Sequence, residues 1–204
     1  IFHIINHATF KAALFMIAGI IDHEAGTRDS RRLGGLATLM PITMTLATIA
    51  AAAMAGLPPF NGFISKEMFF EAALHIDGNP VLAAVAPYLV VVGGVFSVAY
   101  SVRYIHDTFF NGKPRDVPGK PHDPVFGMRF PVILLVVVCI AVGLMPSLIA
   151  EPLVRQAAIA ITGPARVVPQ FHLALWHGLN LPLLMSLIAV AVGVAMYFTL
   201  LRRF

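Results

Sequence analysis

The sequence predicts an all-α membrane protein, a polytopic bundle of transmembrane helices with one helix broken by proline and glycine. Hydrophobic residues make up 58% of the 204 residues and charged residues only 12%, whereas soluble domains average about 45–50% apolar and 25% charged residues. Apolar stretches long enough to cross a hydrocarbon core of about 30 Å recur along the chain. Together these observations predict a multi-pass protein of the lipid bilayer.

The apolar stretches define six expected spans. They cover residues 1–21, 38–57, 60–76, 86–110, 131–150 and 180–201. The third is short and polar and follows Pro58 and Pro59, and such a break is tolerated in hydrocarbon only where protein or water satisfies the freed backbone groups. We therefore expect a broken helix over 56–76, inside the bundle.

Alternation of six spans predicts which loops share a side of the membrane. It puts 111–130 on the side opposite to 22–37 and 151–179. The lysine and arginine counts of the two sides are nearly equal and favour 111–130 as the cytoplasmic side. Residues 151–163 have the amphipathic pattern of a helix that lies along the membrane interface.

The composition argues against several classes of function. The single cysteine, Cys139, lies in an apolar run, where it is expected to pack as a small hydrophobe. The chain has no Gly-x-Gly-x-x-Gly pattern and only one cysteine, so we expect no NADH, flavin or iron–sulfur cofactor. The net charge of +4 comes from short loops that flank apolar runs. The chain has no basic face with interleaved aromatics, so we expect no nucleic-acid binding.

The first span carries a row of titratable side chains. His3, His7 and Lys11 recur at i, i+4 and i+8, which places them on one helix face. A cation near the membrane midplane, as Lys11 would be, costs about 3 kcal/mol or more and therefore usually faces protein or water. Imidazole and a lysine amine shielded from water can both change charge near neutral pH. The row therefore predicts proton transfer, with packing of the histidines as the alternative.

A metal site is the other chemistry that two histidines one turn apart could serve. No carboxylate or third ligand accompanies His3 and His7 on that face, so no metal is expected there.

The two histidines differ in their distance from Lys11 along the helix. His7 lies one turn from Lys11, whereas His3 lies two turns from it. If protons pass along the row, we expect His7 to matter more than His3.

A second lysine near the midplane follows the Pro-Pro break. Lys66 is followed by Glu67 and Glu71, which are expected as possible charge partners that lower the cost of burial and vary its proton affinity. The alternatives are a permanent structural ion pair for Lys66 and a position at the aqueous end of the helix for either glutamate.

Polar residues also gather at helix ends. Arg103, His106 and Asp107, beside tyrosines, are expected as interfacial anchors, with a functional role as the alternative. Asp22 and its neighbours lie at a helix mouth, where they could collect cations or simply be hydrated. The loop GTRDSRR is expected as a solvated turn or a contact with another subunit.

Two segments resemble a known family. HIINHATFKAALFMIAGIIDHEAGTRDSRRLGGL and AGLPPFNGFISKEMFFEA resemble the large A subunit of Mrp-type multisubunit sodium/proton antiporters and, more distantly, the antiporter-like proton-pumping subunits of respiratory complex I. The His-x3-His-x3-Lys helix and the Pro-Pro element before Lys66 carry the likeness, which is strongest over 1–110. The DHEAGTRD run favours the antiporter family over the complex I subunits.

The resemblance implies a fold of inverted repeats, each with a discontinuous helix. Residues 1–110 would be the second repeat's proton-translocating core, and 111–204 would add transmembrane helices and an interfacial segment. His3, His7 and Lys11 would belong to the central hydrophilic axis, and Lys66 would be the lysine of the broken helix. The first repeat has no counterpart here, so we expect a piece of a longer polypeptide that does not transport alone.

The resemblance also implies a function. The chain would be a membrane subunit of a Na⁺/H⁺ antiporter in the plasma membrane, a secondary transporter with other subunits as partners. The alternative is a proton-translocating membrane subunit of an NADH:quinone oxidoreductase-type assembly, and a purely structural role is disfavoured by the midplane lysines.

Overall fold

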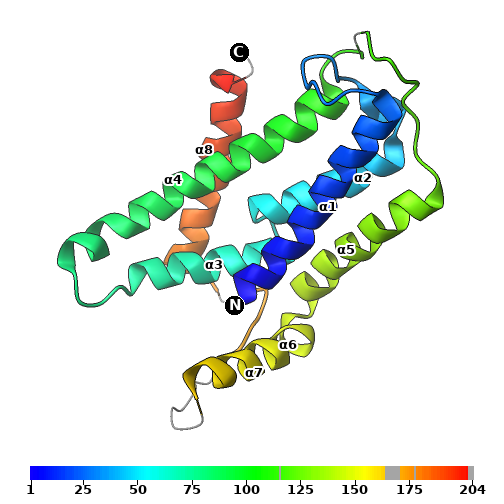
Figure 1. Ribbon diagram of the computed structural model, residues 1–204. Coiled ribbons are helices and arrows are strands. Elements are labelled where there is room, and N and C mark those ends of the chain that lie inside the picture. The colour runs from blue at the N-terminus through cyan, green and yellow to red at the C-terminus, as the bar shows by residue number, and fades with distance from the viewer. Residues whose placement is uncertain (115, 164–170, 177, 202–204) are drawn as a thin grey trace.

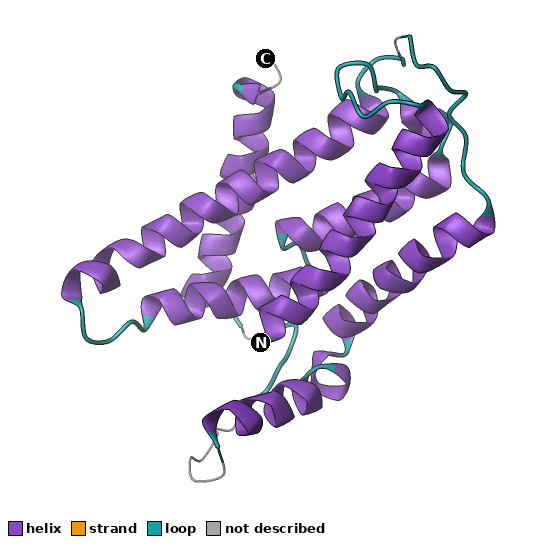
Figure 2. Ribbon diagram, in the orientation of Figure 1, coloured by secondary structure: helices purple, strands orange, loops and turns teal. Residues whose placement is uncertain are grey.

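The computed structural model describes residues 1–114, 116–163, 171–176 and 178–201 (Figure 1). These residues form helices and connecting loops without a strand, which confirms the all-α fold class (Figure 2). The helices are α1 (Phe2–Ala25), α2 (Pro41–Ala55), α3 (Asn61–Leu74), α4 (Pro80–Ile105), α5 (Phe126–Leu144), α6 (Pro146–Ile149), α7 (Glu151–Thr162) and α8 (Leu181–Thr199). A 3₁₀ turn, η1 (Leu36–Thr38), precedes α2, and a π-helical turn, η2 (His106–Phe110), continues α4.

Four helical segments of the described chain are long and apolar enough to cross a membrane. They are α1, α4 together with η2, α5 and α8. In contrast, α2 and α3 have 15 and 14 residues, or about 21–23 Å at 1.5 Å per residue, and each is too short to cross alone. Figure 1 shows α2 running from the 26–40 loop toward the middle of the bundle and α3 continuing to the opposite end.

The break between α2 and α3 corrects two expectations. Residues 38–57 and 60–76 are two halves of one crossing, not two spans. The loops before α2 and before α5 therefore lie at the same end of the bundle, where the Gly119 amide donates to the Ala25 carbonyl at 3.0 Å and His122 pairs with Glu24 at 3.0 Å. The prediction that 22–37 and 111–130 lie on opposite sides was wrong. It counted one interrupted crossing as two, which moves every later loop to the opposite side of the membrane.

Close backbone packing holds the break in the centre. A Cβ added to Gly62 would lie 1.7 Å from the Ala53 carbonyl oxygen, and one added to Gly143 of α5 would lie 2.1 Å from the Pro59 carbonyl oxygen. Small residues permit such approach between membrane helices, where van der Waals packing replaces a hydrophobic driving force. The two half-helices and α5 therefore form one tightly packed unit around the interruption.

The remaining helices surround this unit. The main buried cluster lies between α1, α2 and α5 and includes Ile17, Ala47 and Val136, while α8 packs along α4 (Figure 1). Residues 151–162 form the helix α7, as the amphipathic pattern suggests, at the end of the bundle away from the 26–40 loop (Figure 1). Its position at a membrane interface stays a prediction.

Candidate functional site

The interrupted helix gives Lys66 its hydrogen-bond partner. Lys66 lies in the second turn of α3, and its Nζ donates to the carbonyl oxygen of Ala55, the last residue of α2, at 2.9 Å. Carbonyls at a helix C-terminus have no partner in their own helix and form the negative end of its dipole. The end of α2 therefore stabilises the Lys66 ammonium ion.

The backbone around the break leaves room for the lysine stem. Gly56 caps α2 with φ +75°, and a Cβ there would lie 2.5 Å from Lys66 Cδ. Gly94 of α4 borders the stem on another side, since a Cβ added to it would lie 3.2 Å from Lys66 Cε. Two glycines thus shape the passage through which Lys66 reaches Ala55.

His3 lines the same cavity as Lys66. This cavity has a volume of about 350 Å³ and lies between the first half of α1, α3 and the middle of α4. The His3 Nδ1 atom lies 3.3 Å from the Ser65 hydroxyl oxygen, one residue before Lys66. A cavity of this size holds several water molecules. The structure therefore brings His3 and Lys66 together, although they lie far apart in the sequence.

His7 and Lys11 continue from His3 along α1. The His3 and His7 ring centroids are 5.8 Å apart, and the Lys11 Nζ lies 5.5 Å from the centroid of the Tyr100 ring on α4. Lys11 lines a second cavity of about 230 Å³, which shares Met54 with the Lys66 cavity. The three side chains of the predicted row therefore follow one another along α1. Their role in proton transfer stays a prediction.

The two glutamates after Lys66 face a different space. Glu67 and Glu71 line a pocket of about 600 Å³ together with His75, and Lys66 does not line it. Glu67 is buried, whereas Glu71 is exposed and lies 3.4 Å from His75. Contacts of the Lys66 Nζ include the Ala55 carbonyl and the Phe70 ring, whose centroid is 5.8 Å away. Charge pairing with Glu67 and Glu71 stays a prediction.

A buried amide pair joins α1 to the break, and the sequence analysis did not single it out. Asn6 and Asn61 are fully buried, and the Asn61 amide donates to the Asn6 side-chain oxygen at 3.1 Å and to the Thr9 hydroxyl at 3.1 Å. The Asn6 amide donates in turn to the Asn61 backbone carbonyl at 3.3 Å. Asparagine inside apolar spans is the signal that could have revealed this pair, since buried polar groups need partners.

The predicted interfacial anchors contact a buried tyrosine. Tyr197 of α8 has no exposed surface, and its hydroxyl donates to Asp107 at 2.5 Å and lies 2.7 Å from His106 Nδ1. Arg103 lies 3.4 Å from the other Asp107 oxygen. His106 and Asp107 belong to the π-helical turn η2, a distortion that is frequent at functional sites. These residues therefore attach the end of α4 to α8.

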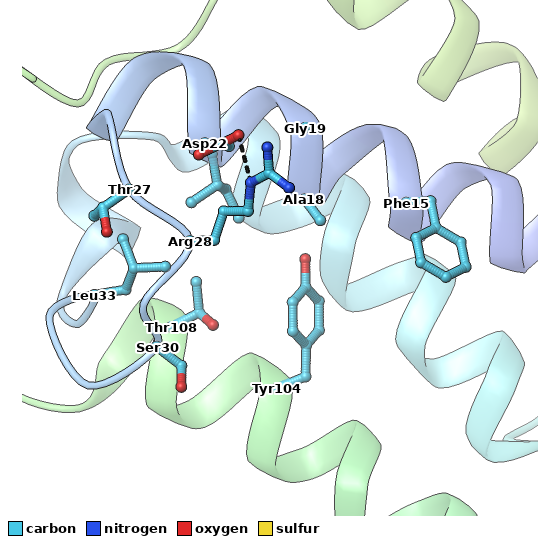
Figure 3. A pocket seen from close by; sticks show the side chains of 11 residues that line it. Phe15, Ala18, Gly19, Asp22, Thr27, Arg28, Ser30, Leu33, Tyr104 and Thr108 are labelled. Carbon is cyan, nitrogen blue, oxygen red and sulfur yellow. Dashed lines mark hydrogen bonds and ion pairs between the residues drawn. The ribbon is translucent and has the colours of Figure 1, made fainter.

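Charged side chains at the helix mouth are paired. Asp22 accepts from the Arg28 guanidinium at 2.9 Å (Figure 3). Glu24 contacts His122 of the neighbouring loop. In the loop, hydrogen bonds from Arg31 lower the pKa of Asp29 to about 2, so this exposed pair persists at physiological pH. Within the described part of the chain, no three His, Cys, Asp or Glu side chains lie close enough together to hold a metal ion.

The fold and this site define a membrane-embedded helical unit with a lysine at a broken helix. Residues 1–95 match the family model described as NADH:quinone oxidoreductase/Mrp antiporter, TM. This confirms the resemblance found in the two sequence segments.

Similar proteins come from monovalent cation/proton antiporters. The chain is 50% identical over 198 residues to the A/B subunit of a probable K⁺/H⁺ antiporter of Rhizobium meliloti, a match that covers 97% of this chain and 20% of that protein. It is 39% identical over 211 residues to the A subunit of a Na⁺/H⁺ antiporter of Bacillus subtilis, covering 98% of this chain and 26% of that protein. The chain thus spans about a fifth to a quarter of these relatives' length.

A solved structure has the same arrangement of helices. The Mrp complex from Dietzia sp. DQ12-45-1b contains a chain that matches all of this one with a TM-score of 0.81 and 34% identity, over 21% of its own length. The likeness extends beyond residues 1–95 and includes α5 and α8 in the same bundle.

Proposed function

We propose that this chain is part of a membrane subunit of a multisubunit Na⁺/H⁺ antiporter, and that it moves protons along His3, His7, Lys11 and Lys66. The observation that carries the proposal is the Lys66 ammonium bound to the end of α2, in one cavity with His3. On this proposal the chain is part of a secondary transporter and not an enzyme. Its partners are other subunits of the complex, the transported Na⁺ and H⁺, and the surrounding lipid.

The chemistry needs a group that gains and releases a proton in a shielded place. When protonated, Lys66 donates to the Ala55 carbonyl at the negative end of α2. When Lys66 releases a proton, water in the cavity carries it to the His3 imidazole, which accepts on one nitrogen and releases from the other. Discontinuous helices commonly form ion sites of this kind in transporters.

The proposal assigns a different role to each of the two parts of the chain. Residues 1–110 form the proton-translocating core, which the family match over 1–95 supports. Residues 111–204 add transmembrane helices that pack on this core, α5 against α1 and α8 against α4, with α7 as the interfacial segment.

The corrected topology favours one orientation. Six described lysines and arginines lie in the loops and helix start at the end that holds 26–40 and 111–125, whereas one lies in α7 at the other end (Figure 1). They are Arg28, Arg31, Arg32, Lys113, Lys120 and Arg129 against Arg155. Because basic loops favour the cytoplasm, the end with Asp22 faces the cytoplasm, and in a bacterium the bilayer is the plasma membrane.

The second candidate is a proton-translocating membrane subunit of an NADH:quinone oxidoreductase-type assembly. The description of the matching family covers both kinds of complex, and a lysine row suits either. The two differ in whether proton movement requires a monovalent cation. The antiporter is preferred because the relatives that match nearly the whole chain belong to antiporters.

The decisive experiment is proton flux in vesicles that hold the full complex. A sodium gradient, or a potassium gradient in a parallel series, should drive proton movement in the wild type, and Lys66→Ala should abolish it in a complex that assembles normally. The control is Lys113→Ala, which removes an exposed loop lysine. Cation-independent flux would contradict the antiporter proposal, and an unchanged Lys66→Ala complex would contradict the role of the lysine.

A further inference from the structure

The Lys11 cavity, which shares Met54 with the Lys66 cavity, also borders a third pocket that reaches the loops. This pocket, of about 560 Å³, is bounded by α1, the loop after it and the end of α4, and it includes Asp22 and Arg28 (Figure 3). It shares Phe15, Ala18 and Tyr104 with the Lys11 cavity. A row of pockets therefore leads from Lys66 past Lys11 to the aqueous end of α1.

Tyr104 stands at the junction of the last two pockets. Its hydroxyl oxygen is buried and finds no hydrogen-bond partner among the described residues. Figure 3 shows the hydroxyl pointing into the pocket that Asp22 and Arg28 border. A buried hydroxyl in a native protein normally has a partner, and both adjoining spaces are large enough for water. The hydroxyl oxygen is shielded from solvent in this structure, so its partner would be a water molecule that enters from one of these two spaces.

The two neighbours of this junction suit proton transfer. On one side lies Lys11, whose ammonium approaches the Tyr100 ring. On the other lies the Asp22–Arg28 pair, with 87% of the Arg28 side chain exposed to solvent. Thr27, Ser30 and Thr108 add hydroxyl groups to the pocket wall beside apolar side chains such as Phe15 and Leu33. Of the three residues that the pocket shares with the Lys11 cavity, Tyr104 is the polar one.

We propose that the Tyr104 hydroxyl passes protons between the aqueous mouth at Asp22 and Lys11, as a second access to the row of titratable side chains. In each passage the hydroxyl oxygen accepts a proton from water on the mouth side and releases its own proton to water on the Lys11 side. The tyrosine then turns its hydroxyl back, unchanged in charge and oxidation state. This inference rests on the proposed proton transport through Lys11.

Two substitutions distinguish a proton relay from a packing role. Tyr104→Phe keeps the ring and removes the relay, so proton exchange should fall at least about a hundredfold, the low end for a positioned proton-transfer group. Tyr104→Ala leaves space that water fills, so it should retain more exchange than Tyr104→Phe. Packing predicts the reverse order, because alanine removes the whole ring.

The measurement is exchange per assembled full complex, with Tyr88→Phe as the matched control, since Tyr88 is an exposed tyrosine on the same helix. Lys11→Ala tests the proposed function separately: if it abolishes exchange while Tyr104→Phe exchanges as the wild type does, only the Tyr104 inference is overturned. Exchange that is lower in Tyr104→Ala than in Tyr104→Phe also overturns it. Should Tyr104→Ala fail to assemble, loss of exchange in an assembled Tyr104→Phe complex supports the relay.

Discussion

The Lys66 ammonium and the Ala55 carbonyl meet at 2.9 Å across a five-residue interruption of one transmembrane crossing. The lysine belongs to one half-helix and its acceptor ends the other. The charge on Lys66 and the geometry of the break are therefore linked, because moving the two half-helices apart removes the acceptor. Substitutions at the lysine and at the packing around the break test this link.

Lys66→Arg should lose nearly as much exchange as Lys66→Ala, falling below about a hundredth of the wild-type rate, as expected when a proton-transfer group is lost. The reason is that guanidinium stays protonated at all working pH values and cannot cycle a proton. Sodium-driven proton flux in vesicles measures this. A fully active arginine variant would show that a fixed positive charge is enough.

The two histidines should differ in the order opposite to the one that sequence spacing suggests. His3 lines the Lys66 cavity and contacts Ser65, whereas the His7 ring packs against Phe10 at 5.5 Å. We therefore expect His3→Ala to reduce exchange more than His7→Ala. Equal rates near that of the wild type, measured in assembled complexes, would favour a packing role for both.

Gly143→Ala should destabilise the bundle by about 1–3 kcal/mol, the usual cost of overpacking. The added Cβ would meet the backbone of Pro59 and Phe60 at 2.1 and 2.7 Å, and backbone cannot move aside as a flexible side chain does. The matched control on the same helix is Gly127→Ala, whose Cβ meets nothing within 4 Å. Thermal unfolding of the detergent-purified complex compares the two, and an unchanged Gly143→Ala melting temperature would contradict the packing described.

Asn6→Leu and Asn61→Leu should be non-additive. Either change alone leaves a buried amide without its partner, at a cost of about 1–3 kcal/mol, whereas the double variant removes both amides. The double-mutant cycle on thermal stability should give a coupling of about 0.5–3 kcal/mol, the range for residues in contact. Simple additivity would mean that the two amides do not depend on each other.

Asp123→Ala should loosen the start of α2. The Asp123 carboxylate accepts from the Ile42 and Thr43 amides at 2.9 Å each and from the Thr43 hydroxyl at 2.8 Å, so it caps the helix from a distant loop. Loss of an N-cap costs about 0.5–2 kcal/mol. Asp77→Ala, at an exposed carboxylate in another loop, serves as control. If both variants melt at the same temperature, the cap contributes nothing measurable.

The sequence determined the fold class, the position of the apolar segments and the row on α1. Hydrophobic runs set where helices form in a bilayer, and the 3.6-residue period places His3, His7 and Lys11 on one face whatever the rest of the chain does. The Pro-Pro break was also visible, because proline lacks a backbone donor. These are local properties of the chain.

Only the tertiary structure decided that the two halves of the broken helix form one crossing, and which groups they contact. Hydropathy cannot distinguish two short spans from one interrupted crossing, because both give two apolar runs, and the error reversed the side of every later loop. The Ala55 acceptor for Lys66, the Asn6–Asn61 pair and the pocket at Tyr104 depend on which helices pack together. That packing is set by close approach at Gly62 and Gly143, a steric match between distant segments that no local pattern encodes.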